Sequence, residues 1–222
     1  MKLHLENYST QILKNISLEI EKKNLIILGS NGAGKTTLAK VLSGIIPTSQ
    51  IAFEEPKTKF INYIPAKLEI FDDYLNAREL LELSLLYSQK KVDEVLALLE
   101  ITHLKEKPCK FLSSGESQLL LLASAILHNA KYTILDEPTS NLDPKKVKMV
   151  YEILKTEEYL QNRIIITHNL NFAYKLGEDI VYMQEGEISF LGSNEQFFSD
   201  ENLYKLFGSS VKKVDDNIVI NL

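Results

Sequence analysis

The chain has 222 residues, of which 45% are apolar, with a formal net charge of −5 and an isoelectric point near 5.5. This length and apolar fraction suit one globular domain with a real core, and they exclude a disordered or low-complexity protein. No run of Lys or Arg reaches the density of a nucleic-acid footprint, so a nucleic-acid partner is disfavoured.

The cysteine count and the hydropathy favour a protein of a reducing cytoplasm with no membrane span of its own. The single cysteine, Cys109, cannot form an intramolecular disulfide, and no Cys/His cluster has metal-ligand spacing. Residues 1–7 lack the continuous apolar core of a signal peptide. The longest apolar stretch, residues 119–127, is far shorter than the ~20 residues that span a bilayer. We therefore expect any membrane association to come through a partner.

Residues 1–20 alternate between apolar and polar side chains, which predicts two half-buried strands joined by a polar turn near residues 8–10. Tyr8 lies where an aromatic ring could stack on adenine, a contact worth roughly 1–3 kcal/mol for bases in general. An ordinary turn tyrosine fits the sequence equally well, so both interpretations stay open.

The next segment has the full phosphate-loop pattern G-x-x-x-x-G-K-[ST], with apolar residues before it and a helical pattern after it. Its glycines let backbone N–H groups turn toward a β-phosphate, and the following helix adds its positive N-terminus. We expect Lys35 to reach the β- and γ-phosphates and Thr36 to bind Mg²⁺. An ordinary glycine-rich turn does not explain the whole pattern. The expected nucleotide-binding residues of this loop are Gly29, Ser30, Asn31, Gly32, Ala33, Gly34, Lys35, Thr36 and Thr37.

The middle of the chain predicts short strands at residues 51–53 and 60–64, then helices at residues 74–86 and 92–99. Ser113 or Ser114 is a suitable N-cap for a longer helix that runs to residue 127. A run of helices between strands indicates a helical subdomain, at approximately residues 70–128, inserted in a nucleotide-binding core.

Strands and a helix alternate further along the chain, at residues 132–135 (strand), 144–154 (helix), 163–166, 180–183 and 187–191 (strands). This order predicts an α/β fold with a mainly parallel sheet and ligand groups at its carboxyl edge. Asp136 and Glu137 follow the first of these strands, and His168 stands at the end of the second.

These three polar residues suit phosphoryl chemistry at that edge. Asp136 can hold Mg²⁺ through water opposite Thr36, and Glu137 can align or deprotonate the attacking water. His168 could hydrogen-bond the γ-phosphate and help to fix Glu137 and the water. Taken alone, an acidic pair at a strand end is a helix cap or a turn, and a lone histidine is a structural residue. The phosphate loop earlier in the chain favours the catalytic interpretation.

Taken in chain order over about residues 1–198, these motifs resemble those of the ATPase subunit of an ATP-binding cassette (ABC) transporter. Residues 29–37 resemble the family's Walker A, residues 132–137 its Walker B with the catalytic glutamate, and His168 its switch histidine. Residues 140–143, which end in Asp143, resemble its D-loop. Only the LSGGQ signature separates this family from other phosphate-loop ATPases, and residues 112–116 resemble it through Leu112, Ser113, Ser114, Gly115 and Glu116.

The resemblance implies the P-loop NTPase (RecA-like) fold with an N-terminal antiparallel β subdomain, and a single ABC domain over residues 1–208. For the tail at residues 209–222 we expect either an edge strand or a cover for the sheet, and the sequence assigns it no role. ATP and Mg²⁺ are the implied cofactors, and a second cassette, in a homodimer, is the implied partner. The signature of one cassette would close on ATP held by the other, with the Ser113 hydroxyl and the Gly115 N–H as a second anion cradle. ATP binding would join the subunits and hydrolysis would release them.

Two departures from the family pattern concern the signature and residue 66. Ser114 replaces the commonest glycine and Glu116 the commonest glutamine, and we expect function to survive both changes. Ala66 stands where the family usually has a glutamine that contacts Mg²⁺ or its water and senses the transmembrane partner. Because alanine has no acceptor to offer, we hypothesise slower or differently coupled hydrolysis.

The leading hypothesis is the energy-coupling ATPase of a membrane transporter, held at the inner face of the cell membrane by a separate permease. A substrate-binding protein is a possible further partner. Residues 70–86 would supply the docking surface, although helix core must explain at least half of their apolar residues. The signature variant resembles those of importers for metal ions or metal chelates. The alternatives are a soluble ABC ATPase that remodels a macromolecular complex and a regulatory nucleotide-binding subunit with little turnover.

Overall fold

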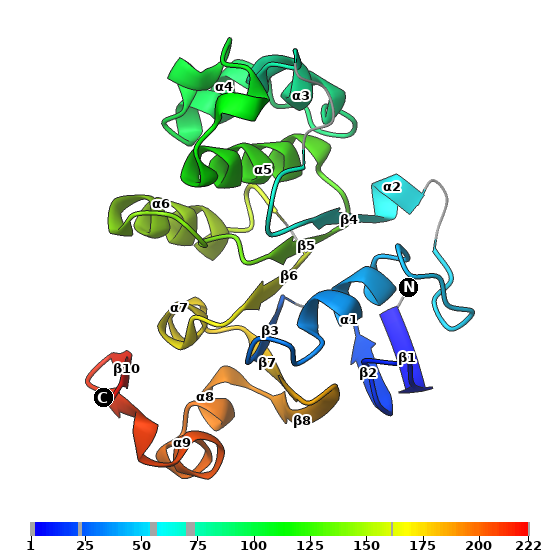
Figure 1. Ribbon diagram of the computed structural model, residues 1–222, viewed down its shortest axis with the longest axis vertical. Helices are drawn as coiled ribbons and strands as arrows, with labels where there is room; N and C mark the ends of the chain where they lie inside the picture. The colour runs from blue at the N-terminus through cyan, green and yellow to red at the C-terminus, as the bar shows by residue number, and fades with distance from the viewer. Residues whose placement is uncertain (1–2, 22–23, 54–56, 70–73, 161, 222) are drawn as a thin grey trace. The chain divides into compact units, whose positions relative to one another are not determined.

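The computed structural model describes residues 3–21, 24–53, 57–69, 74–160 and 162–221 (Figure 1). The chain divides into two compact units, one formed by residues 1–52 with 164–222 and the other by residues 53–163. Among the described residues, no helix combines the length and the apolarity that a membrane crossing requires.

The first unit contains sheet strands in the order β6-β3-β7-β8. β3 (Leu25–Gly29) is parallel to both of its neighbours, β6 (Asn162–Thr167) and β7 (Asp179–Gln184), and β8 (Glu187–Gly192) is antiparallel to β7. β3 is buried along its whole length, as expected of an uninterrupted apolar strand between two parallel neighbours. α1 (Lys35–Leu42) packs on β3.

The predicted N-terminal strand pair is confirmed, with β1 (Leu3–Tyr8) antiparallel to β2 (Ile16–Ile20). The strand predicted at residues 51–53 is wrong, because these residues form no regular element. The Gln50 side chain explains the difference. It makes two hydrogen bonds to the backbone of Glu6, at 2.8 and 3.0 Å, and so occupies edge groups of β1 that a third strand would need.

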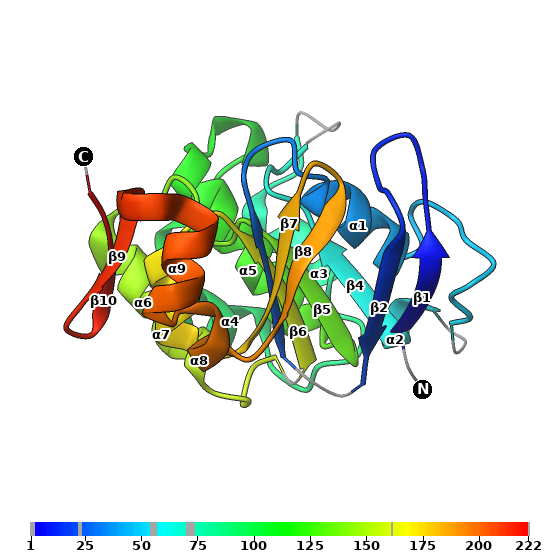
Figure 2. The ribbon, with the colours of Figure 1, turned by 90° about the horizontal axis from the view of Figure 1, so that it is seen from below.

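The C-terminal part of this unit consists of α7 (Leu170–Leu176), α8 (Asn194–Phe197), α9 (Asp200–Phe207), a 3-10 turn η3 (Gly208–Ser210), β9 (Val211–Val214) and β10 (Asn217–Ile220). β9 and β10 form a separate hairpin that packs on α7 and α9 (Figure 2). The Ile218 N–H donates to the Asn171 side chain at 2.9 Å. The tail therefore packs against helices and does not add an edge strand to the larger sheet.

The second unit is built around α5 (Ser114–His128), in which residues 118–127 are all buried. α3 (Ala77–Leu83), α4 (Val92–Leu98) and β4 (Ile61–Ile64) pack against this helix. β4 is parallel to β5 (Tyr132–Asp136). The remaining elements are α2 (Lys57–Phe60), η1 (Thr102–Leu104), η2 (Cys109–Phe111) and α6 (Pro144–Lys155). Phe60 thus ends a helical turn, whereas the sequence placed it in the following strand.

The helix predicted at residues 74–86 is shorter in the structure and runs from Ala77 to Leu83, with its start set by a cap at Asn76. The Asn76 side chain accepts from the Glu79 N–H and the Glu79 carboxylate accepts from the Asn76 N–H, both at 2.9 Å. This capping box fixes the start of α3 at Ala77. Leu83, in its last turn, is 72% exposed, so the apolar residues here are not all core. Residues 70–73 of the predicted docking segment lie outside the described residues.

Candidate functional site

The phosphate loop (residues 29–37) joins β3 to α1 within the first unit. Gly32 and Gly34 have φ angles of 80° and 97°, and Gly34 is the N-cap of α1. At Gly29 φ is 155°, and a Cβ there would lie 2.4 Å from the Met183 carbonyl oxygen. The loop therefore depends on glycine for its turns and, at position 29, for a close backbone approach.

Lys35, the first residue of α1, is only 7% exposed. Its Nζ donates to the carbonyl of Gly29 at 2.8 Å and to that of Ser30 at 2.9 Å, which holds the ammonium group over the loop. The first turn of α1 has no acidic residue, so nothing within the helix neutralises its positive end. The loop, the lysine and the helix N-terminus together fit a bound polyphosphate. Of the remaining predicted loop residues, Asn31 and Thr36 are exposed, Thr37 is half-buried and Ala33 is buried.

β6 brings His168 to the same edge of the sheet as the phosphate loop. Leu28 of β3 is paired with Thr167 of β6 in parallel register, so Gly29 and His168 are the next residues on two adjacent strands. His168 is exposed at this edge. Tyr8 is the half-buried last residue of β1, and its stacking on adenine stays a prediction.

Asp136 ends β5 in the second unit and is 3% exposed. Its Oδ2 accepts a hydrogen bond from the Tyr63 hydroxyl at 3.0 Å. Burial, then the charge of Asp136 and this hydrogen bond, raise the pKa of Tyr63 well above its usual value. The sequence did not single out Tyr63. The sequence shows a tyrosine hydroxyl in the strand before Pro65, but the residue to which this hydroxyl donates depends on the pairing of β4 with β5.

Glu137 follows Asp136 with its backbone in the left-handed region, at φ 51°. Its carbonyl accepts from the Ser140 N–H at 3.0 Å and from Gln118 Nε2 at 3.1 Å. Sequence reasoning missed Gln118 as well, because this contact joins α5 to a loop 19 residues away. The predicted magnesium residue and the predicted base are thus each held by a side chain from a neighbouring element.

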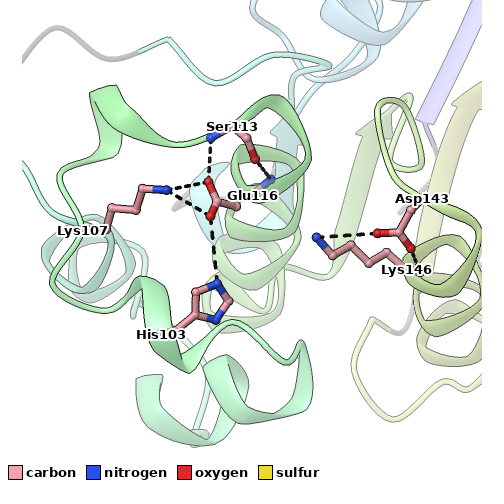
Figure 3. Close-up of polar contacts among 6 residues, drawn as sticks. All are labelled: His103, Lys107, Ser113, Glu116, Asp143 and Lys146. Carbon is pink, nitrogen blue, oxygen red and sulfur yellow. Dashed lines mark hydrogen bonds and ion pairs between the residues drawn. The ribbon is translucent and has the colours of Figure 1, made fainter.

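The signature (residues 112–116) leads into α5, and of the two predicted N-caps, Ser113 and Ser114, Ser113 is the one in the structure (Figure 3). The Ser113 hydroxyl accepts from the Glu116 N–H at 3.3 Å, and Glu116 Oε2 accepts from the Ser113 N–H at 2.7 Å. Lys107 Nζ donates to both carboxylate oxygens of Glu116, at 3.0 and 2.8 Å, and His103 Nε2 lies 4.0 Å away. Burial raises the pKa of the Glu116 carboxyl, but the hydrogen bonds from Lys107 and Ser113 outweigh it and lower that pKa to about 2.

The D-loop (residues 140–143) lies against the first turn of α5, and its last residue caps α6. A Cβ on Gly115 would lie 2.9 Å from the Asn141 carbonyl oxygen. Asp143 is the N-cap of α6, where its Oδ1 accepts from the Lys146 N–H at 3.0 Å (Figure 3). Lys146 Nζ lies 3.9 Å from the other carboxylate oxygen. Asp143 therefore has a structural role within its own chain.

A cavity of about 350 Å³ adjoins the start of α5 in the second unit. Ala66 lines it, so the residue that departs from the family pattern faces a space beside the signature. The lining residues are Ala66, Lys67, Leu68, Cys109, Lys110, Leu112, Ser114, Ser117, Gln118 and Asn141.

Comparison with known proteins agrees with this arrangement of motifs. The family model described as "ABC transporter" matches residues 13–140. The zinc import ATP-binding protein ZnuC of Vibrio vulnificus (strain YJ016) is 31% identical over 207 residues, which are 91% of this chain and 78% of that protein. The molybdate/tungstate import ATP-binding protein WtpC of Methanocaldococcus jannaschii is 34% identical over 195 residues, 81% of this chain and 65% of that protein.

Solved structures show that the fold is shared. One solved structure, a dimeric ATP-binding cassette in a post-hydrolysis state bound to ADP and phosphate, is similar to this chain with a TM-score of 0.71 and 22% sequence identity. The match covers 87% of this chain and 97% of that one. The predicted α/β P-loop NTPase fold is thereby confirmed. The family match and the similarity to ZnuC establish that the chain belongs to the ABC transporter family, as an ATP-binding subunit with ATPase activity.

Proposed function

We propose that this ATPase powers the import of a metal ion or metal chelate through a separate permease, beneath which it works as a cassette homodimer at the inner face of the cell membrane. The names of ZnuC and WtpC, both import proteins for metals or their oxyanions, support the cargo class. A substrate-binding protein would deliver the cargo to the permease.

The observation that carries the transporter assignment is a set of exposed apolar side chains on the second unit. Tyr74, Leu83, Leu86 and Phe111 are 88%, 72%, 52% and 64% exposed, and the Lys110 ammonium lies over the rings of both Tyr74 and Phe111. Lys110 brings Tyr74 and Phe111 together at this surface, and neighbouring exposed aromatic side chains are typical of protein contacts. The permease is their proposed partner, in agreement with the docking role that the sequence suggested for residues 70–86.

The proposed hydrolytic roles follow from the chemistry of each group. The N–H groups of the phosphate loop and Lys35 bind the β- and γ-phosphates, with Thr36 and Asp136 as the groups that would hold Mg²⁺. Bound Mg²⁺ would neutralise charge on those phosphates. Glu137 accepts a proton from the attacking water or orients it, and His168 donates a hydrogen bond to the γ-phosphate.

The proposed dimer places the signature of one copy on the ATP of the other. The Ser113 hydroxyl retains its own proton for donation while it accepts from the Glu116 N–H, so it can cap α5 and bind an anion together. Glu116 brings a negative charge to this cradle, and Lys107 offsets it. The start of α5 is therefore compatible with an anionic ligand.

Three measurements test the proposal. The purified chain should hydrolyse ATP, and a tagged chain should recover a multi-spanning membrane protein from detergent-solubilised membranes of its host. Uptake of radioactive zinc or molybdate by cells that carry or lack the gene then identifies the cargo class. Recovery of only soluble partners would favour a remodelling ATPase instead.

Ala66 favours a second candidate, a regulatory subunit with little turnover, because alanine lines the cavity where the family's glutamine would supply an acceptor. The same ATPase assay decides between them. Rapid hydrolysis by the chain alone or with its permease excludes the regulatory role.

A further inference from the structure

The backbone of Glu137 has a conformation that needs an external restraint. Its φ of 51° is in the left-handed region, which is unfavourable for a residue with a Cβ. A turn bond from the Ser140 N–H to the Glu137 carbonyl, at 3.0 Å, is one restraint. The second comes from a side chain outside the turn, that of Gln118.

Gln118 is a buried amide with a defined target. It is 4% exposed, and its Nε2 donates to the Glu137 carbonyl at 3.1 Å. Buried polar groups in folded proteins are hydrogen-bonded, and losing the donor would remove a hydrogen bond that restrains the strained carbonyl from outside its turn. Gln118 also borders the cavity beside the start of α5, so a side chain of similar length can be accommodated there.

α5 contacts the segment from Glu137 to Asn141 at a second point. Gly115 and Gln118 are three residues apart and so lie on one face of α5. The Gly115 Cα faces the Asn141 carbonyl so closely that a Cβ would lie 2.9 Å from it. One face of the signature helix therefore touches both ends of the segment from Glu137 to Asn141.

We propose that Gln118 is a positioning residue for Glu137, fixing its left-handed backbone and with it the direction of its carboxylate. This inference rests on the proposed role of Glu137 as the general base. It makes α5 a physical link from the signature to that base. When the first turn of α5 moves, Gln118 moves the Glu137 backbone with it.

The test compares two substitutions at position 118 with a control on the same helix. Gln118→Met keeps the length and removes the donor, while Gln118→Glu keeps the shape and replaces the donor by a carboxylate at neutral pH. Ser117→Ala, from the next residue and the same cavity wall, is the matched control. For each variant we would measure kcat and KM for ATP hydrolysis, the affinity for a fluorescent ATP analogue, and the unfolding midpoint.

We expect Gln118→Met to lower kcat about tenfold with KM and nucleotide affinity within about twofold of the parent, which corresponds to the loss of one hydrogen bond. Gln118→Glu should be less active at pH 8 and recover relative to the parent as the pH falls to 6, because burial at this position raises the pKa of a carboxyl and only the protonated carboxyl can donate. Ser117→Ala should match the parent. A role in packing alone would not produce this pH dependence.

The outcomes separate the two proposals. If the parent hydrolyses ATP and Glu137→Gln does not, but Gln118→Met retains the parent kcat, the positioning role is refuted and the base assignment stands. If the kcat of Gln118→Glu relative to that of the parent does not change with pH, the positioning role is also refuted. This comparison still tests the proposal if Gln118→Met proves unstable. If Glu137→Gln itself turns over normally, the proposed base is wrong.

Discussion

Replacement of Glu116 by glutamine, the commonest residue at this place in the signature, isolates the contribution of one charge to the start of α5. Glutamine can still accept from the Ser113 N–H, so the capping box is retained. The two hydrogen bonds from Lys107 lose their charged acceptor. We therefore expect Glu116→Gln to lower the free energy of unfolding at pH 7 without changing the fold.

The structure sets the size of this effect. The pKa of Glu116 falls from its ordinary 4.5 to about 2, and one pKa unit corresponds to about 1.4 kcal/mol, so the upper limit is about 3 kcal/mol. Glu116 and Lys107 side chains are 17% and 35% exposed, and solvent screening of such a pair reduces the expected loss to about 1–2 kcal/mol. Because the folded pKa is the lower one, the stabilisation is complete above about pH 4.5 and disappears as the pH falls to 2.

Urea unfolding followed by circular dichroism measures this difference. At pH 7 the parent should be more stable than Glu116→Gln by about 1–2 kcal/mol, and at pH 3 the difference should fall to less than half. The double variant with Lys107→Met supplies the control, since the two substitutions should be strongly non-additive. Equal stabilities at pH 7, or a difference that is the same at both pH values, would refute the assignment of the effect to the Glu116 charge.

Three further predictions concern turnover. Glu137→Gln should lower kcat at least about 100-fold while ATP binding is preserved, as measured by phosphate release and by equilibrium binding of a labelled nucleotide. Ala66→Gln should raise the ATPase rate and alter its Mg²⁺ dependence. If both are unchanged, the hypothesis that alanine at this position slows hydrolysis is refuted. Tyr63→Phe removes the hydrogen bond to Asp136 and should raise the half-saturating Mg²⁺ concentration about tenfold, whereas an unchanged Mg²⁺ titration would show that the hydroxyl does not orient the carboxylate.

The features that the sequence predicted well are those that local rules determine. The glycines of the phosphate loop, the cap at Ser113 and the strand that ends at Asp136 all depend on residues a few positions apart. The contact of Tyr63 with Asp136 spans 73 residues and depends on the pairing of β4 with β5. No local pattern contains that register, so the contact could not be predicted.

The helix expected at residues 74–86 illustrates a different limit. Hydrophobic periodicity identifies an apolar face but does not say whether that face meets the core or another protein. Leu81 is fully buried, whereas Leu83 and Leu86 are 72% and 52% exposed. The apolar residues follow helical spacing over the whole predicted segment, but the capping box at Asn76 sets the start of α3 at Ala77, and the helix ends at Leu83.

The two variants of α5 separate its stability from its contribution to turnover. Glu116→Gln weakens the link between the first turn and Lys107 but leaves Gln118 on the Glu137 carbonyl. Gln118→Met breaks that contact but leaves the cap at Ser113 intact. If Gln118 positions the base, the first variant should lose stability while the contact of Gln118 with Glu137 stays intact, and the second should lose kcat with little change in stability. A helix that only supports the fold would show both effects together in each variant.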